Sequence, residues 1–216
     1  MASSFSFDSL NQAQRQAVAA LDGPVLILAG AGTGKTRTVT CRIAHMLEKK
    51  IPPDQILAVT FTNKAASEMR ERIGGMVSKK AANEMTVCTF HSLGVRLLRG
   101  GIDKLGYKKN FSICSGSDQV GIMKQLLDRM GGTDEKVKPE AVLGAISNAK
   151  NKGLDPAELE DDFFANLAVA YQNELRAQNA VDFDDLLLFA EKILREHSDV
   201  RDYFRHKYTR VTVDEF

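Results

Sequence analysis

Apolar residues along the first hundred positions follow two alternating patterns. Short apolar runs at 24–28, 56–60 and 85–90 predict buried strands. Around these runs, apolar residues recur every three or four positions, which predicts helices. The helical positions are Leu10, Ala13, Ala17, Val18 and Leu21, then Val39, Ile43, Met46 and Leu47, then Met69 and Ile73, then Val95, Leu97 and Leu98. Strands that alternate with helices indicate a parallel α/β sheet.

Polar residues, prolines and glycines mark where these elements begin and end. Asp8-Ser9 is predicted to cap the first helix, and Asp22-Gly23-Pro24 to end it. Pro52-Pro53 separates the second helix from the second strand, and Asn63 is predicted to cap the third helix. The pair Gly100-Gly101 is predicted to end the fourth helix.

The pattern changes after about residue 117, where strand signals become rare. Helical periodicity dominates from there to residue 206, with apolar stripes at 120–130, 141–150, 163–175 and 183–194. A strand-like segment precedes this region at 111–114, and the chain returns to a strand pattern at 210–216. We therefore expect a mostly helical insertion or subdomain within an α/β fold.

The composition is that of an ordinary globular protein. Its 216 residues are enough for one large domain or one domain with an insertion. With 44% hydrophobic residues and a net charge of +1, no global field draws the chain to nucleic acid, so such binding would need a local surface. The sequence has no bilayer-spanning run, no signal-peptide pattern and three scattered cysteines, so we expect a reduced, cytoplasmic protein with no membrane partner.

A glycine-rich phosphate-binding motif, Ala-Gly-Ala-Gly-Thr-Gly-Lys-Thr, lies at 29–36 between the first strand and the second helix. Glycines let backbone N–H groups approach phosphates, and the following helix offers free N–H groups and the positive end of its dipole. Lys35 can reach the β- and γ-phosphates, and the Thr36 hydroxyl can ligate Mg²⁺. Ala29 stands where the usual pattern has glycine, which is a small change in size. The motif predicts nucleoside triphosphate binding.

The segment Val211–Glu215 is a second candidate site. A β-branched strand that ends in two acids suits a Mg²⁺ ligand, Asp214, followed by Glu215 to polarise an attacking water. Alone, an Asp-Glu pair after a strand also fits a solvated turn. The phosphate-binding motif upstream favours the catalytic interpretation.

Two other strands end in residues suited to single-stranded nucleic acid. Phe61, within Thr60–Ala66, lies beside hydroxyls, an amide and a lysine, a set that can stack a base and hold a phosphate. His91, within Thr89–Ser92, occupies the corresponding end of the next strand. The alternatives are a Phe61 that belongs to the core and a His91 that only caps its helix.

Gln14 and a group of aspartates allow more than one interpretation. A side-chain amide donates and accepts at once, so Gln14 matches the edge of adenine, although a surface glutamine would look the same. The aspartates Asp182, Asp184 and Asp185 could suggest a metal site. We favour a helix N-terminus, where acidic groups suit the dipole.

Together these segments resemble superfamily-one DNA helicases of the UvrD/Rep type, and the Rep-like branch most closely. Six stretches match in the family's order; they are 10–18, 28–37, 58–66, 89–94, 182–187 and 213–216. The resemblance implies a RecA-like P-loop NTPase with a parallel sheet and a mostly helical inserted subdomain. It assigns 1–106 to the first part of the ATP-binding domain (1A), 107–207 to the helical subdomain (1B) with a return to 1A near its end, and 208–216 to the Walker B strand of 1A.

The resemblance also implies roles for the matched residues. The ATP-binding set is Gln14, Ala29, Gly30, Ala31, Gly32, Thr33, Gly34, Lys35, Thr36 and Arg37. Within it Gln14 would read adenine, while Thr36 and Asp214 would hold Mg²⁺. Lys35 and Glu215 would be catalytic. The DNA-binding set is Phe61, Thr62, Asn63, Lys64, Thr89, His91 and, within 148–153, Lys150.

The match ends inside the acidic motif, at Phe216. The family's later parts would then be missing, including the second RecA-like domain and the arginines that clamp the γ-phosphate. In the family's topology the next strand inserts between the phosphate-loop strand and the acidic strand. We therefore expect an incomplete sheet with two exposed edges at a gap, and a chain that is poorly stable, prone to aggregation and inactive on its own.

The function implied is that of the ATP-binding and hydrolysis half of a 3′–5′ DNA helicase or translocase in replication or repair. Its cofactors would be ATP and Mg²⁺, and its partners single-stranded DNA, single/double-strand junctions and the missing C-terminal helicase domains. One alternative is a truncated, non-enzymatic fragment with weak ATP and DNA binding. Another is an unrelated P-loop enzyme such as a small-molecule kinase, which would need neither 60–66 nor 89–92.

Overall fold

The computed structural model describes residues 7–30, 32–130 and 137–215, and the chain divides into two compact units. Unit 1 is Met1–Leu93 with Asp202–Phe216, and unit 2 is Gly94–Arg201. The two divisions fall within helices α5 (Phe90–Gly101) and α10 (Ser198–Lys207). The boundaries expected from the family resemblance, after 106 and after 207, lie later in the chain, and the assignment to 1A and 1B stays a prediction.

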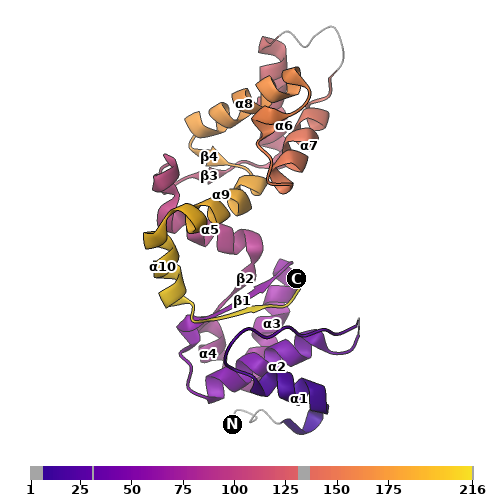
Figure 1. The fold of residues 1–216 in the computed structure, drawn as a ribbon, viewed down its shortest axis with the longest axis vertical. Coiled ribbons are helices and arrows are strands. Elements are labelled where there is room, and N and C mark those ends of the chain that lie inside the picture. The colour runs from indigo at the N-terminus through magenta and orange to yellow at the C-terminus, as the bar shows by residue number, and fades with distance from the viewer. Residues whose placement is uncertain (1–6, 31, 131–136, 216) are drawn as a thin grey trace. The chain divides into compact units, whose positions relative to one another are not determined.

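A parallel three-stranded sheet forms the centre of unit 1 (Figure 1). Its strands are β2 (Thr86–Thr89), β1 (Ile56–Thr60) and β5 (Arg210–Val213), in the order β2-β1-β5. All five residues of β1 are buried and all but Thr60 are apolar, as expected for a central parallel strand that is covered on both faces. The register joins the carboxyl ends of the three strands at one edge, and it confirms the predicted parallel α/β sheet.

Four helices accompany this sheet: α1 (Gln12–Ala19), α2 (Lys35–Glu48), α3 (Asn63–Met76) and α4 (Lys79–Glu84). Short 3₁₀ turns lie at Phe7–Ser9 and Pro53–Gln55. The predicted apolar stripes of α2 and α3 form the core with β1 and β2. Its members include Val39, Ile43, Met46, Ile56, Ala58, Met69, Ile73 and Val87.

Two predicted helix caps are wrong by one to three residues. Asn11, not Asp8-Ser9, caps α1, because Asn11 and Gln14 exchange side-chain-to-backbone hydrogen bonds in a capping box. Thr62, not Asn63, caps α3, because the Thr62 hydroxyl accepts from the Ala65 N–H. Helix α4 was not predicted from the apolar pattern, since its six residues contribute one buried side chain.

The apolar segment 24–28 forms no strand, contrary to its pattern. Within the described chain no strand pairs with it, and Leu26 and Leu28 are 72% and 87% exposed. A cavity of about 690 Å³ separates it from 211–215, so the expected gap beside β5 is present. A strand is stable only when its backbone groups find a neighbour, and here the segment has none.

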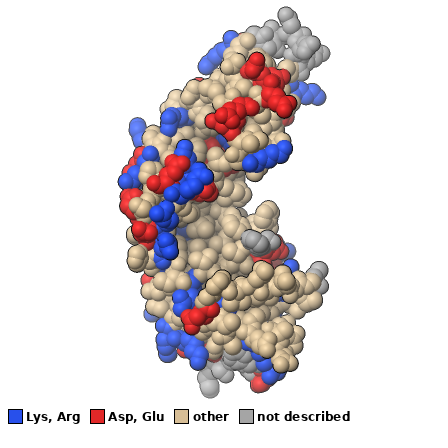
Figure 2. All heavy atoms as spheres, in the orientation of Figure 1, with Lys and Arg blue, Asp and Glu red and all other residues tan. Residues whose placement is uncertain are grey.

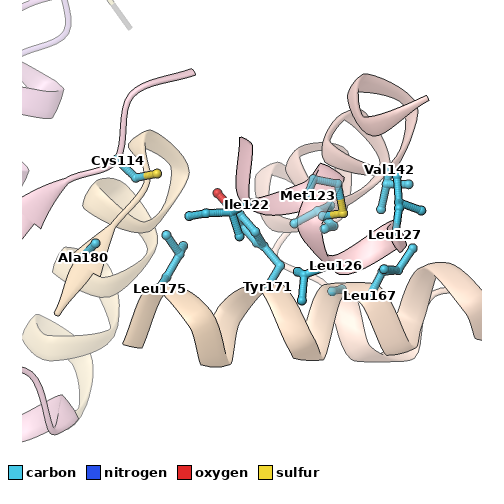
Figure 3. Close-up of a cluster of buried hydrophobic side chains, with 12 residues drawn as sticks. Cys114, Ile122, Met123, Leu126, Leu127, Val142, Leu167, Tyr171, Leu175 and Ala180 are labelled. Carbon is cyan, nitrogen blue, oxygen red and sulfur yellow. The ribbon is translucent and has the colours of Figure 1, made fainter. Parts of the chain in front are cut away.

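Unit 2 is mostly helical, as predicted. Its helices are α5, η3 (Ile102–Leu105), α6 (Gly116–Arg129), α7 (Pro139–Asn151), η4 (Pro156–Glu158), α8 (Asp162–Ala177) and α9 (Phe183–Glu196). Two short parallel strands, β3 (Ser112–Ile113) and β4 (Ala180–Val181), pair within it. Figure 3 shows Leu167, Tyr171 and Leu175 of α8 in the core that α6 and α7 complete. No helix in the described part of the chain is long and apolar enough to cross a membrane.

Candidate functional site

The phosphate-binding motif leads directly into the N-terminus of α2. Gly32 and Gly34 have φ values of +75° and +91°, which glycine adopts without steric cost. Gly34 caps α2, so Lys35 and Thr36 are its first two residues and their N–H groups have no partner within the helix. This is the arrangement that binds phosphate groups. Ala31 lies outside the described residues.

Gln14 connects α1 to this loop. Its side-chain N–H donates to the Thr33 carbonyl at 3.2 Å, and its side-chain oxygen accepts from the Asn11 N–H at 3.0 Å. The Thr33 hydroxyl in turn donates to the Gly30 carbonyl at 2.7 Å. Gln14 thus helps to hold the loop in place, and this role does not depend on the adenine contact predicted for it. Sequence reasoning missed Asn11, although the Asn-x-x-Gln spacing of a capping box would have revealed it.

Asp214 meets Thr36 where β5 ends. Its N–H donates to the Val59 carbonyl at 3.0 Å, which extends the β1–β5 ladder and fixes its position. The Thr36 hydroxyl donates to one carboxylate oxygen of Asp214 at 3.3 Å. The other oxygen, Oδ1, is buried and has no hydrogen-bond partner among the described residues. Hydroxyl and carboxylate oxygens are the ligands Mg²⁺ uses in proteins, so this pair fits that ion.

Burial governs the charge on Asp214. Desolvation raises the pKa of its carboxyl, the hydrogen bond from Thr36 opposes that rise, and the nearby Glu215 carboxylate adds to it. Lys35, Asp214 and Glu215 line the same cavity. The structure therefore brings four predicted ATP-site residues, including Thr36, to one place. The side chain of Arg37 lies exposed one residue further along α2.

The residues predicted to contact DNA follow the neighbouring strand ends. The register pairs Thr60 with Thr89, so the segments that follow β1 and β2 lie at the same sheet edge. The ring of Phe61 is 72% exposed, and the alternative that it belongs to the core is wrong. Thr62, Asn63 and Lys64 are exposed at the start of α3.

Thr89 and His91 lie at the start of α5. Thr89, not His91, acts as the cap, because the Thr89 hydroxyl accepts from the Ser92 N–H at 3.2 Å. Thr89 is also buried, whereas His91 is partly exposed. Figure 2 shows basic and acidic side chains interspersed on the face in view, in keeping with the net charge of +1.

Lys150 is not placed as the family resemblance suggests. It is 4% exposed, and its ammonium bonds to Asp182 at 2.8 Å and Asp185 at 2.7 Å. Burial opposes its charge, but the two carboxylates outweigh that effect and raise the pKa of Lys150. An ammonium held in this way cannot also reach a DNA phosphate. We therefore leave Lys150 out of the proposed DNA contacts.

The contacts of these aspartates also bear on whether they form a metal site or a helix N-terminus. Asp182 caps α9 and exchanges hydrogen bonds with Asp185 in a capping box, so the predicted helix N-terminus is confirmed. No group of three or more His, Cys, Asp or Glu side chains suited to a metal occurs among the described residues.

Comparison with known proteins identifies the family. The UvrD/REP helicase N-terminal domain matches residues 10–216. The chain belongs to this family. Members of the UvrD/REP family carry a RecA-like P-loop fold in this domain, which agrees with the sheet and loop described above.

Several curated relatives are ATP-dependent DNA helicases named PcrA. The Bacillus subtilis protein is 39% identical over 215 residues, which are 96% of this chain and 29% of the relative. The Leuconostoc citreum protein is 41% identical over 217 residues, 97% of this chain and 29% of the relative. A Staphylococcus aureus protein is 39% identical over 215 residues. The chain thus spans under a third of the length of these UvrD/REP relatives.

Proposed function

We propose that this chain is the ATP-binding and hydrolysis half of an ATP-dependent DNA helicase or translocase. The observation that carries the proposal is the 3.3 Å contact between the Thr36 hydroxyl and the Asp214 carboxylate. It joins the phosphate-binding loop to the acidic strand across 178 residues of sequence. A P-loop NTPase needs this juxtaposition to hold a metal ion beside the triphosphate.

Each residue of this site has a proposed role. The N–H groups at the start of α2 and the Lys35 ammonium bind the β- and γ-phosphates. Thr36 and Asp214 hold Mg²⁺, which supplies charge neutralisation at the phosphates when it is bound. Glu215 accepts a proton from the attacking water. Gln14, Arg37 and the loop residues 29–34 complete the nucleotide site.

The DNA site is proposed at the same edge of the sheet. Phe61 presents an exposed ring on which a base can stack, and Asn63 and Lys64 offer an amide and a cation for the backbone. β1 lies between β2 and β5, so its carboxyl end separates the Thr89–His91 segment from Asp214. A domain movement driven by ATP binding or hydrolysis would therefore act directly on the bound DNA.

The finer details of the proposal are those that the sequence resemblance implies. The substrate is single-stranded DNA and single/double-strand junctions, movement is 3′ to 5′, and the setting is replication or repair in the cytoplasm. The partners are the C-terminal helicase domains.

A second candidate is a non-enzymatic piece that retains only weak ATP and DNA binding. The cavity of about 690 Å³ beside β5 favours it, because the segment 24–28 that leads into the phosphate-binding loop pairs with no strand among the described residues. A loop held on one side by Gln14 would bind phosphates with a larger entropic cost.

ATP hydrolysis with and without single-stranded DNA tests both candidates. It is measured for this chain and for a longer protein that contains it. Turnover in the longer protein that DNA stimulates, with none in this chain, supports the helicase proposal. Turnover that ignores DNA would overturn it, and the absence of turnover from both proteins would favour the non-enzymatic candidate.

A further inference from the structure

Helix α1 carries Gln14, yet it has little apolar anchorage in unit 1. Val18 is the one buried side chain among its eight residues, and it packs in a small cluster with Leu10, Cys41 and the partly buried Met76. A helix this short is not stable by itself and depends on its contacts with the rest of the domain. Figure 1 shows α1 beside α2. The position of Gln14 therefore depends on the polar contacts that hold α1 in place.

Arg42 of α2 holds the carboxyl-terminal end of α1. Its guanidinium donates to the Ala17 carbonyl at 2.7 Å and also to the Ala20 carbonyl. The last carbonyls of a helix have no partner within it, and a cation is favourable at this end of the helix dipole. Arg42 is 8% exposed, and burial lowers the pKa of its guanidinium, a cost that these hydrogen bonds offset. The ATP and DNA sites proposed above do not use Arg42.

The contact of Arg42 with α1 lies one turn from Gln14. Ala17 and Gln14 are three residues apart, so they share a face of the helix. Both line a cavity of about 460 Å³ together with Thr33 and Lys35 of the phosphate-binding segment. This volume is in the range of small-molecule sites, and Lys35 makes the cavity continuous with the phosphate site. The arrangement suits a base that is attached to a bound triphosphate.

The orientation of the Gln14 amide is fixed at both of its polar atoms. The nitrogen donates to the Thr33 carbonyl, and the oxygen accepts from the Asn11 N–H. These bonds use one of its two donors and one of its two acceptor positions. The second donor and the second acceptor position match the edge of adenine, whereas guanine has an acceptor, O6, in place of the adenine N6 donor. An amide held this way distinguishes the two bases, while a loose amide can turn over and suit either.

We propose that Arg42 is a positioning residue for nucleotide selection, which holds α1 by its last carbonyls and so keeps the Gln14 amide where it selects adenine over guanine. The inference rests on the proposed ATP site and on the adenine contact predicted for Gln14. Without the guanidinium, the Ala17 and Ala20 carbonyls lose their donor and α1 loses its attachment to α2 at this end. Selection would then weaken although no group that touches the nucleotide had been changed.

The preference for ATP over GTP tests this proposal. Dissociation constants of the full chain for ATP and GTP analogues, labelled on the ribose so that the base stays intact, are measured for the wild type, Arg42→Met, Gln14→Ala and the double variant. The matched control is Arg70→Met, which removes another arginine of unit 1 that donates to a backbone carbonyl, that of Val87 at 2.6 Å. A variant that only destabilised the fold would behave as this control does.

We expect Arg42→Met to lower the ATP preference by about fivefold or more, the value of a correctly paired base edge, and Arg70→Met to leave it unchanged. The double variant should show the preference of Gln14→Ala, because Arg42 acts through Gln14. Arg42→Lys, a milder change that keeps the positive charge, should show the same effect in smaller measure. An unchanged preference in Arg42→Met, an equal loss in Arg70→Met, or a double variant that loses more than Gln14→Ala would overturn the proposal.

Amide hydrogen exchange in the nucleotide-free chain keeps the inference separate from the proposed function. We expect residues 12–20 to lose protection in Arg42→Met and, less strongly, in Arg42→Lys, but not in Arg70→Met. Unchanged protection of α1 would refute the anchoring by Arg42. If the wild type binds neither nucleotide, the proposed ATP site fails. If it binds ATP and GTP equally while α1 loses protection as expected, nucleotide selection by Gln14 and Arg42 is refuted and the ATP site stands.

Discussion

At the residue scale, Asp214 is subject to two opposing demands. A metal ligand must be ionised, yet burial raises the pKa of this carboxyl. Burial, the neighbouring Glu215 and an oxygen with no hydrogen-bond partner among the described residues make the charged form costly when no cation is bound. A bound Mg²⁺ would remove that cost. We therefore expect the metal-free chain to be less stable with this carboxylate than with a neutral side chain at the same position.

Asp214→Asn should accordingly separate stability from metal binding. Because the pKa is raised in the folded state, the penalty applies above that pKa and is relieved as the pH falls through it. We expect the metal-free variant to have a higher thermal midpoint than the wild type at pH 7, with the difference shrinking in acid. Mg²⁺ binding in the wild type should weaken at a higher pH than the ordinary aspartate value of about 3.9 implies. An equal or lower midpoint for the variant at pH 7 would contradict this account.

Phe61→Ala tests the proposed stacking contact. The exposed ring should contribute about 1–3 kcal/mol to single-strand binding, the usual value for one stacked base. Fluorescence anisotropy with a labelled oligonucleotide measures the loss. Tyr203→Ala is the matched control, since this exposed aromatic lies on α10, which precedes the opposite end of β5. Equal effects of the two substitutions would remove Phe61 from the site.

The positions of site residues were predictable where a local motif fixes them, and their roles stay predictions. Lys35, Thr36 and Asp214 come together as expected, because the loop leads directly into α2 and Asp214 follows the carboxyl end of a parallel strand, the edge where such sheets gather ligand-binding residues. The location of Lys150 was not predictable in this way. Whether a lysine on a helix faces solvent or a buried pair of acids depends on packing between helices, which local sequence does not reveal.

At the element scale, α5 and α9 approach unusually closely at Gly94. A Cβ added there would lie 2.6 Å from the Leu186 carbonyl oxygen, a backbone atom of α9 that cannot move freely. Glycine in a helix otherwise costs about 1 kcal/mol relative to alanine, so the position is explained by this contact. The pair fixes how α9 lies on α5.

Gly94→Ala should therefore destabilise the chain despite the better helix propensity of alanine. We expect a loss of about 1–3 kcal/mol, the usual cost of overpacking, in chemical denaturation. Gly121→Ala in α6 is the control, because a Cβ there meets nothing within 4 Å. That variant should gain about 0.5–1 kcal/mol. A stabilising effect at both positions would show that the α5–α9 contact is looser than described.

The apolar pattern predicted most helices and strands, but it did not predict where helices begin or whether a strand has a partner. It identified β1 and β2 and the helical character of unit 2, since burial on one face or on both leaves a direct signature in sequence. The pattern failed at 24–28, because an apolar run shows that a segment is suited to a sheet, not that a partner strand stands beside it. The predicted caps of α1 and α3 were wrong because several neighbouring polar residues can cap a helix, and the pattern does not show which one does. Asn11 caps α1 in place of Asp8-Ser9, and Thr62 caps α3 in place of Asn63.

At the scale of the whole molecule, unit 1 has an open sheet edge. β5 pairs with β1 on one side, and on the other it faces the cavity that separates it from 24–28. Val211 and Val213 are exposed on this strand, and Leu26 and Leu28 are exposed across the gap. An unpaired, apolar edge is a template for pairing with another chain.

Val211→Lys should reduce self-association of the chain. A charge on an edge strand disfavours pairing with a second edge, so we expect less light scattering and a later onset of aggregation on heating. Val169→Lys, which places the same charge at an exposed valine of α8 in unit 2, should leave aggregation nearly unchanged. If the two variants behave alike, the edge of β5 is not the source of association.

The central claim is that the loop before α2 and the end of β5 together form a Mg²⁺–ATP site. Its most direct test is a titration of the chain with a fluorescent ATP analogue, with and without Mg²⁺. Lys35→Ala removes the phosphate-binding ammonium, and Lys49→Ala at the other end of α2 serves as the control. The account predicts binding that strengthens with Mg²⁺, is lost in Lys35→Ala and persists in Lys49→Ala. Binding that is indifferent to both Mg²⁺ and Lys35 would contradict it.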